Sequence, residues 1–499
     1  MKAALNDFQL SIRSSIPVQF ITFFIRMLTT FCQLQSRRTL IHLRHHIRRH
    51  APFLIRRHPS TTSISKPLLT ESINGRERVY TKPSHPSKPL LYAWTADAGT
   101  RMGVWRGGVL GWIKAMFLPV GYPGSVHPVY AKVHVYQFVE TLIWSTVSVL
   151  CNQAMLSSIG VGSPAATTGA VAIQWVLKDG IGEIGKLFFI QRFSRSFDSH
   201  PKTWKLVGEV SSLGGAFLQL CTAIAPGGWF LGLAGVGYAL RSIHYSIWGA
   251  THMTFTRNFA LQGNVGDLVA KDDSQMSVAH LLGMLIGVCA ITFSHTPTFL
   301  FTTFFLLGPL HFTTTLALLR AARFEVLNQT TLALVCWKFV REGRVSGVEE
   351  LRPYEKWFGE WIKNDVPVAR IRIGVEVNTA FKEAGEVEGV LSVLKAENYL
   401  LTPTPNPCLL LHPSATPHDI IKGMLHATAI HTLLTENPTA EPLKALASSH
   451  AWAIEKFPGF VVEIDEKGWQ SDAVFWEDVG RRVVWDREIP VIEEENGSV

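Results

Sequence analysis

The chain has 499 residues, of which 47% are hydrophobic and 17% are charged, with a formal net charge of +8. Charged residues make up about 25% of an ordinary soluble domain, so the composition argues against an ordinary soluble enzyme. The positive charge is also confined to the first 60 residues, which hold ten Lys or Arg and one acid and leave the rest of the chain at −1. A nucleic-acid-binding surface requires a basic folded body, so we exclude nucleic acid as a partner.

Residues 1–60 predict an organellar leader. The segment is rich in Arg, Ser and Thr, nearly free of acids and apolar between its charges, which is typical of a mitochondrial presequence. A location in the endoplasmic reticulum and a disordered basic tail are the alternatives. Residues 61–90 are rich in Pro, Ser and Thr and predict a linker. The six cysteines are scattered, with no CxxC pair, so they indicate neither a disulfide framework nor a zinc site.

The region from 91 to 340 predicts a membrane domain. Three stretches in it, 141–177, 210–240 and 274–319, contain no Asp, Glu, Lys or Arg. Each exceeds the roughly 20 residues that one membrane span needs, and each is interrupted by turn residues, at 160–164, 225–228 and 294–297. The last stretch is the clearest helical hairpin. Hydropathy therefore favours an integral membrane protein.

Residues 341–499 predict a small α/β domain with an acidic tail. Alternating apolar residues at 369–377 and short apolar runs at 408–412 and 459–465 indicate strands. Helical spacing appears at 386–398 and at 416–434, where Thr416 is suited to cap the helix. The predicted fold is mostly α, with a multi-span α-helical membrane domain followed by this small α/β C-terminal domain.

Two patterns resemble known sites without their required context. Gly180, Gly182 and Gly185 form a G-x-G-x-x-G, but no clean strand precedes them and no βαβ series surrounds them, so close helix packing is the favoured interpretation over a nucleotide loop. The histidines at 412, 418, 426 and 431 do not have a metal-binding spacing, and we expect surface or capping roles for them and no metal.

Polar residues that border the apolar stretches are the candidate ligand-binding set. Charges in or near membrane spans usually face a cavity or one another; their alternative role is to end helices at the interface. The densest group lies at 267–275, where we expect a helix N-terminus that attracts an anion. The candidates are Lys178, Asp179, Lys186, Asp198, Lys202, Asp267, Lys271, Asp272, Ser274 and Gln275.

Several motifs resemble the root UVB sensitive family. They are FLPVGYPGSV (117–126), AVAIQWVLKDGIGEIGKLFF (171–190), FDSHPKTWKLVGEVSS (197–212), residues 249–287, ENYLL (397–401) and LLLHPSATPHDIIKGMLHA (409–427). The resemblance implies a membrane- or organelle-associated protein of vitamin B6 photoprotection and homeostasis, and no assigned reaction. Asn258 stands where a His is common in the family, and Glu209 where an Asp is.

The sequence thus favours a non-enzymatic organellar membrane protein that acts as a carrier or scaffold, with mitochondria preferred. Pyridoxal phosphate is the possible ligand, held near Lys271. The expected partners are membrane lipid and, as an oligomer partner, another family member. The alternatives are an enzyme in which Lys178, Lys186 or Lys271 forms a Schiff base with pyridoxal phosphate, and a structural partner-binding membrane protein.

Overall fold

The computed structural model describes residues 67–73, 76–81, 91–94, 109–160, 168–356 and 358–486. The leader predicted at 1–60 lies outside them. The segment predicted as a linker contains two strands, β1 (Pro67–Ile73) and β2 (Arg76–Thr81), which pair antiparallel. Strand β3 (Leu91–Trp94) pairs antiparallel with β2. This three-stranded sheet lies in a unit, residues 1–99, that is separate from residues 100–499.

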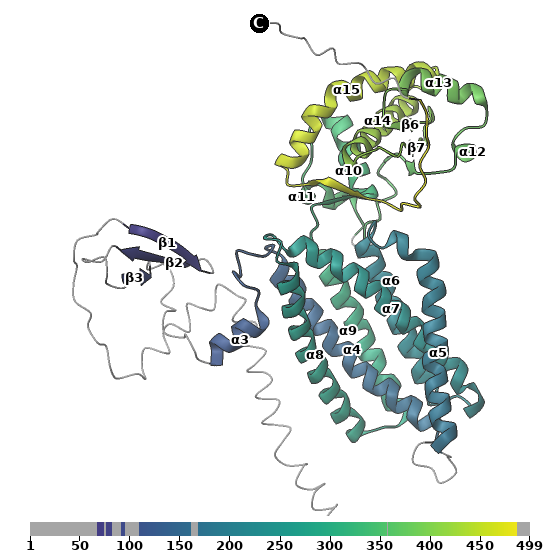
Figure 1. Cartoon of the computed structure of the whole chain (residues 1–499). Helices are drawn as coiled ribbons and strands as arrows, with labels where there is room; N and C mark the ends of the chain where they lie inside the picture. The colour runs from purple at the N-terminus through teal and green to yellow at the C-terminus, as the bar shows by residue number, and fades with distance from the viewer. Residues whose placement is uncertain are drawn as a thin grey trace, which may run out of the picture. The chain divides into compact units, whose positions relative to one another are not determined.

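The second unit begins with a bundle of long helices (Figure 1). Helix α3 (Val109–Phe117) precedes α4 (Tyr130–Ser158), α5 (Thr168–Phe193), α6 (Pro201–Cys221), α7 (Phe230–Phe259), α8 (Val265–Phe293) and α9 (Pro297–Ala321). The turns predicted at 225–228 and 294–297 separate α6 from α7 and α8 from α9. Thr296 caps α9 by accepting a hydrogen bond from the Phe299 amide, and Pro297 takes the first helical position, which needs no N–H donor.

Helix α4 lies at the centre of the bundle and packs against α6, α8 and α9, while α7 packs against α5 and α6. Small residues allow these close approaches. Gly182 and Gly185 lie within α5, where an added Cβ would meet Tyr238 and Ala239 of α7. The G-x-G-x-x-G pattern therefore lies inside a helix and serves helix packing, as favoured from the sequence.

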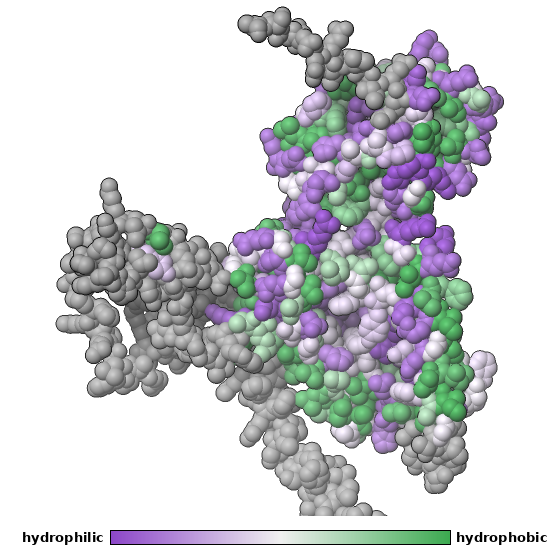
Figure 2. All heavy atoms as spheres, viewed as in Figure 1, coloured by the Kyte–Doolittle hydropathy of each residue, from purple (hydrophilic) through white to green (hydrophobic). Residues whose placement is uncertain are grey.

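By length and composition, two helices among the described residues are apolar enough to cross a membrane, α8 and α9. Only 22% of the most apolar window of α8 and 33% of that of α9 is buried, whereas the core helix of a soluble protein is mostly buried. Large apolar side chains are also exposed on α5, such as Val176, Leu187 and Phe188, at 68%, 64% and 69%. Figure 2 shows hydrophobic residues over much of the outer surface of α5 and α8.

The C-terminal domain has its own hydrophobic core, which includes Leu334, Tyr399, Leu409, Ile421 and Phe460. Strand β7 (Cys408–Leu411) lies between β5 (Arg372–Ile373), which is parallel to it, and β6 (Tyr399–Leu401), which is antiparallel. Strands β4 (Val326–Asn328) and β8 (Gln470–Phe475) form a parallel pair. The helices are α10 (Gln329–Glu342), α11 (Val348–Leu351), α12 (Val377–Ala380), α13 (Ala384–Leu394), α14 (Pro417–Glu436) and α15 (Pro442–Glu466).

The structure confirms the strand predicted at 408–412 and the helix predicted from Thr416, whose hydroxyl accepts a hydrogen bond from the Asp419 amide. The strand predicted at 459–465 is wrong, because these residues lie in α15. Phe460 and Ile464 are buried and four residues apart, which is the spacing of one helix face. The strand predicted at 369–377 is reduced to the two residues of β5.

The close contact between α4 and α8 predicts that one added methyl group lowers the stability of the bundle. A Cβ at Gly283 would lie 2.6 Å from the Ser145 Cβ and against the Leu142 carbonyl oxygen. We expect Gly283→Ala to lower the free energy of unfolding by about 1–3 kcal/mol, the usual cost of overpacking. Gly249→Ala is the matched control, because a Cβ at Gly249 meets nothing within 4 Å, and alanine there adds up to about 1 kcal/mol of helix propensity. Thermal unfolding of the purified chain in mild detergent measures both, and equal melting temperatures would contradict the packing argument.

Candidate functional site

A cavity of about 540 Å³ opens between α4, α5, α7 and α8. Aromatic side chains line it together with polar groups, among which are two cations, Lys186 and Arg241, and one carboxylate, Glu183. The lining residues are Trp144, Ser145, Ser148, Val149, Asn152, Glu183, Lys186, Tyr238, Arg241, Ser242, Tyr245, Ser246, His280 and Met284. This combination suits an anionic ligand with an aromatic ring.

Arg241 on α7 is the buried cation of the cavity, with 8% of its surface exposed. Its guanidinium donates hydrogen bonds to Gln219 Oε1 at 2.8 Å and to Ser148 Oγ at 2.5 Å, and its Cζ lies 4.8 Å from the centre of the Trp144 ring. Both acceptors are neutral, and no carboxylate among the described residues forms an ion pair with it. Its positive charge is therefore available to an anion.

Two further cavity residues, Lys186 and His280, supply nitrogen donors. Lys186 on α5 is ion-paired with Glu183. His280 on α8 lies 2.5 Å from the Ser145 hydroxyl through its Nδ1. Of the ten candidates taken from the sequence, Lys186 alone lines this cavity.

A second polar cluster lies inside the bundle, centred on Lys205 of α6. The Lys205 ammonium is 2.8 Å from Glu140 Oε2 on α4 and also contacts Glu209 Oε1. Thr315 on α9 donates a 2.5 Å hydrogen bond to the other oxygen of Glu140. His311 Nε2 on α9 lies 2.9 Å from Glu209 Oε2. All five residues are buried, so each charge depends on these partners for stabilisation.

Glu140, Glu209 and His311 bring possible metal-ligand atoms within 4.8 Å of one another. The ammonium of Lys205 contacts both carboxylates and thus takes the position between them that a cation would occupy. We therefore assign this cluster to an internal ion pair and not to a metal.

Asp272 lies at the centre of a third cluster, two turns into α8. Its carboxylate is 3.1 Å from His134 Nε2 and 2.9 Å from His252 Nε2, and Gln137 donates to it at 3.4 Å. The expected position of Asp272 and Ser274 at a helix N-terminus is wrong, because α8 starts at Val265 and Asn264 takes the N-cap position. Gly263, with φ of +67°, allows the chain to turn just before it.

The other residues of the 267–275 group fasten α3 and the turn after it to α8. Lys271 Nζ donates to the Ala115 carbonyl at 2.6 Å, and Gln275 Nε2 donates to the Phe117 carbonyl at 2.7 Å. Asp267 Oδ2 accepts from the Val120 amide at 2.7 Å, while Ser274 bonds within its own helix. In this arrangement the Lys271 ammonium has protein partners.

The remaining candidates are dispersed. Lys178 is buried, pairs with Asp179 at 2.5 Å and lies over the Trp175 and Tyr238 rings. Asp198 accepts a 3.2 Å hydrogen bond from Thr254.

Lys202 is at the start of α6, where its backbone N–H donates to Glu360 Oε1 at 2.8 Å. Its ammonium lies 5.1 Å from the centre of the Phe324 ring.

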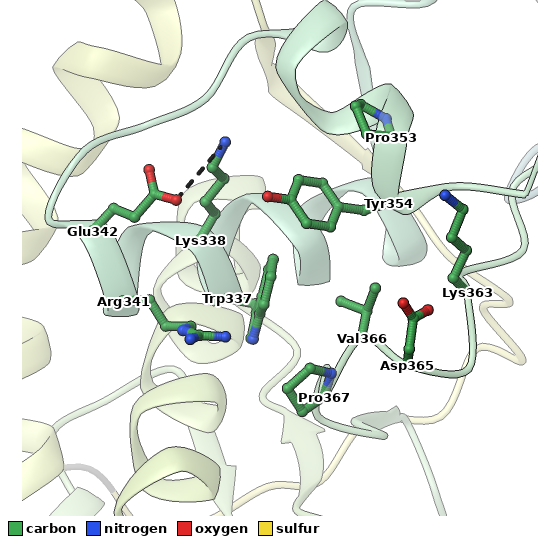
Figure 3. Close-up of a pocket in the computed structure, with 10 residues that line it drawn as sticks. All are labelled: Trp337, Lys338, Arg341, Glu342, Pro353, Tyr354, Lys363, Asp365, Val366 and Pro367. Carbon is green, nitrogen blue, oxygen red and sulfur yellow. Dashed lines mark ion pairs between the residues drawn. The ribbon is translucent and has the colours of Figure 1, made fainter.

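The C-terminal domain carries a cavity of about 480 Å³ beside α10 (Figure 3). Figure 3 shows Trp337, Lys338 and Arg341 on α10 facing Tyr354 and a loop that carries Lys363 and Asp365. Lys338 has nearby acidic partners, Glu342 at 3.9 Å and Glu350 at 3.7 Å. Because two carboxylates, Glu342 and Asp365, line this cavity and its Lys338 has acidic partners, whereas the hydrogen-bond acceptors of Arg241 are neutral, we do not place the ligand there.

The four C-terminal histidines do not converge, but the surface or capping role expected for His426 is wrong. It is fully buried, with its ring 3.1 Å from the Tyr399 hydroxyl and 3.0 Å from the Ser449 hydroxyl. Burial lowers the pKa of His426 to about 3, so the ring is neutral at physiological pH. Burial raises the pKa of Glu397, but hydrogen bonds from His450 and Lys422 outweigh this effect and hold that pKa at about 2.

Sequence comparison gives the chain a family. Residues 106–343 match the family model described as a vitamin B6 photo-protection and homoeostasis domain, and residues 361–478 match the root UVB sensitive protein C-terminal model. No solved structure matches the chain.

Three of the relatives are curated proteins of Arabidopsis thaliana. Protein root UVB sensitive 3 is 27% identical over 393 residues, covering 77% of this chain and 87% of the relative. Protein root UVB sensitive 6 is 27% identical over 66% of this chain and 65% of the relative. Protein root UVB sensitive 2, chloroplastic, is 26% identical over 74% of this chain and 84% of the relative.

The Lys205 cluster predicts a large stability effect. Lys205→Met leaves the Glu140 and Glu209 carboxylates buried without their shared cation, and we expect a loss of about 3–5 kcal/mol, as when one partner of a buried ion pair is removed. The double variant Lys205→Met, Glu140→Gln should recover part of this loss, because Glu209 retains His311. Lys186→Met is the matched control: that pair is partly exposed, at 26% and 55%, and should contribute less than about 1 kcal/mol. Melting temperatures in detergent report all three, and an equal loss for Lys186→Met and Lys205→Met would refute the argument.

Proposed function

The chain belongs to the root UVB sensitive family, and from that premise we propose that it is a non-enzymatic integral membrane carrier acting in vitamin B6 homeostasis. The proposed cargo is a phosphorylated vitamin B6 form such as pyridoxal phosphate. The match of residues 106–343 to the vitamin B6 domain supports the process. The structural support comes from the distribution of polar and apolar groups in the same residues.

The observation that carries the proposal is that the bundle buries charged side chains among its apolar core residues and exposes large apolar side chains on its outer surface. Large apolar side chains are exposed on every helix from α5 to α9 (Ile173, Val176, Ile184, Leu187, Phe188, Val210, Val236, Leu281, Phe293, Phe305, Leu306 and Leu310). Meanwhile Lys178, Glu209, Arg241, Asp272 and His311 are buried within it. A soluble protein rarely exposes an apolar patch of this extent, whereas lipid requires apolar side chains outside and paired charges within.

The helix lengths suit a bilayer. Helices α8 and α9 have 29 and 25 residues, and α4 and α7 have 29 and 30. At 1.5 Å per residue, these helices exceed the roughly 30 Å hydrocarbon core. We propose that α4 to α9 all span the membrane, because the buried polar residues that lower the hydropathy of α4 to α7 face one another and not lipid.

The cavity around Arg241 suits the proposed cargo. A phosphate would accept hydrogen bonds from Arg241 and Lys186, since charge-assisted bonds to cationic nitrogens are the strong ones. The pyridine ring would lie among Trp144, Tyr238 and Tyr245, which line the same cavity. This moves the proposed anion site from Lys271 to Arg241.

A pyridoxal-phosphate enzyme is the second candidate, because Lys186 lines the cavity. A Schiff base would form on its amine, which the structure pairs with Glu183. Borohydride reduction of the loaded protein decides between the two: a covalent adduct that is lost in Lys186→Met would establish the enzyme-type site.

We propose membrane lipid as the partner of the apolar surface, and another family member as the oligomer partner, which the particle mass in detergent would test. An organellar membrane, mitochondrial first, is the proposed location, because residues 1–60 have the composition of a presequence. The name of one relative includes the word chloroplastic.

Membrane insertion and location are tested together by fractionating cells that express the full chain. We expect the protein to sediment with mitochondria and to stay in the pellet after alkaline carbonate, because the exposed side chains of α5, α8 and α9 contact lipid. Release as a soluble monomer would overturn the membrane proposal, and sedimentation with the endoplasmic reticulum would correct the organelle.

The ligand proposal is tested by replacing Arg241. We expect Arg241→Gln to weaken binding of pyridoxal phosphate by the purified chain about 10- to 100-fold, because one hydrogen bond to a charged group contributes about 1.5–3 kcal/mol. Arg257→Gln is the matched control, since Arg257 is exposed on the same helix. Absorbance titration measures the affinity. Unchanged affinity in Arg241→Gln would exclude the cavity, and no binding by the wild-type chain would favour a scaffold.

A further inference from the structure

The Lys205 cluster carries an unbalanced charge. Glu140 and Glu209 contribute two negative charges, and Lys205 contributes one positive charge. Two imidazoles complete the set, His311 on α9 and His244 on α7, both buried. With neutral imidazoles, the cluster has a net charge of −1 in a water-poor interior, which is costly. One additional proton makes the cluster neutral.

Both imidazoles have a free ring nitrogen at this point. His311 contacts Glu209 through Nε2, at 2.9 Å, while its Nδ1 is buried with no hydrogen-bond partner. His244 Nδ1 is also buried without a partner and lies 3.8 Å from Glu209 Oε1, beyond hydrogen-bond distance. A buried polar atom without a partner is uncommon in a native protein and calls for an explanation. Here the unpartnered Nδ1 atoms of the two imidazoles are where the additional proton can bind.

A polar stripe of α4 connects the cavity with the Asp272 cluster and passes beside Glu140 of the Lys205 cluster in the sequence. Side chains separated by three or four residues lie on one helix face, and those of this stripe are His134, Gln137, Thr141, Ser145, Ser148 and Asn152. His134 and Gln137 contact Asp272, Ser145 contacts His280, and Ser148 contacts Arg241. Glu140 is not part of the stripe, but it lies directly before Thr141 in the sequence. The stripe extends over about 27 Å at 1.5 Å per residue.

From these observations we propose that Glu209, His244 and His311 form a proton-binding site that couples proton movement to transport through the Arg241 cavity. This inference rests on the proposed carrier function. In the binding step, the Nε2–H of His311 donates to Glu209, and a proton adds to the lone pair of His311 Nδ1. A hydronium ion supplies the proton, so one of its O–H bonds breaks as the N–H bond forms, a water molecule is left, and the cluster changes from −1 to neutral. Release of the proton reverses the step.

The groups that face Glu209 come from each helix packed against α6. They are Glu140 on α4, His244 on α7 and His311 on α9, in addition to Lys205 on α6 itself. Replacing Glu209 with Gln leaves Lys205 paired with Glu140. The charges of this pair cancel, so the cluster is neutral without an additional proton. Glu209→Gln is therefore expected to fold and to mimic the proton-loaded state permanently.

The test uses the full chain in liposomes, with pyridoxal 5′-phosphate as the probe. We expect an inwardly directed proton gradient to raise the initial uptake rate of the wild-type chain several-fold. Glu209→Gln and His311→Gln should lose the stimulation by the gradient, while Glu209→Asp, which retains a carboxylate, should keep it. Glu455→Gln is the matched control, because Glu455 is exposed in the C-terminal domain and should behave as the wild type.

A second measurement does not depend on transport. Infrared spectra of the purified chain with isotope-labelled histidine, recorded across neutral pH, should show a histidine protonation that is absent in Glu209→Gln and His311→Gln. Its absence from the wild-type chain would overturn the proton site whatever the uptake result. Uptake without gradient stimulation would overturn the coupling and leave the carrier function intact. A protonation that depends on Glu209, with no uptake of the probe, would retain the proton site and overturn the proposed cargo.

Discussion

The ammonium of Lys205 between the carboxylates of Glu140 and Glu209 is the interaction on which the helical bundle depends. It joins α4 to α6 and, through Thr315 and His311, it also joins both to α9. Charges this deeply buried are tolerated only when each finds its partners with good geometry, so the pairing restricts how these three helices can be placed. The positions of α4, α6 and α9 relative to one another follow from that restriction.

The same constraint explains why, among the described residues, hydropathy alone identifies α8 and α9 as candidate spans. Helices α4, α6 and α7 carry the charged and polar residues that pair inside the bundle, and a window average cannot separate an inward-facing charge from an outward-facing one. Arg241 illustrates this, since it is buried on a helix whose exposed residues include Val236 and Tyr245. Periodicity distinguishes the two faces, as the α4 stripe from His134 to Asn152 demonstrates.

Features set by local chemistry could be predicted from the sequence. The turns at 225–228 and 294–297, the Thr416 cap and the packing role of Gly182 and Gly185 all depend on residues close in the chain. Residues 459–465 were open to a strand interpretation because Pro458 and Gly459 suggest a break. Tertiary packing of Phe460 and Ile464 decides for the helix.

The candidate site was less predictable, because it depends on which distant residues meet. The 267–275 group is the densest set of charges in its region, yet Asp272 is bound by His134 and His252 from two other helices. Two residues of the cavity and the ion cluster, His280 and His311, are isolated within the apolar stretch 274–319, and a search limited to Asp, Glu, Lys and Arg passes over them. A search for polar residues at helical spacing in α4 would have found the stripe.

The C-terminal domain also contributes to the helix that carries the ion pair. The first backbone N–H groups of a helix have no partner within it, and at the start of α6 the Glu360 carboxylate accepts those of Lys202 and Thr203, each at 2.8 Å. A carboxylate at this end also offsets the positive end of the helix dipole. Lys205 lies one turn further along α6 and Glu209 one turn beyond that, so a residue of the C-terminal domain anchors the helix that positions both. Glu360 lies directly before the second of the family's two matched regions, 106–343 and 361–478, so this contact attaches the chain just ahead of that region to the base of α6.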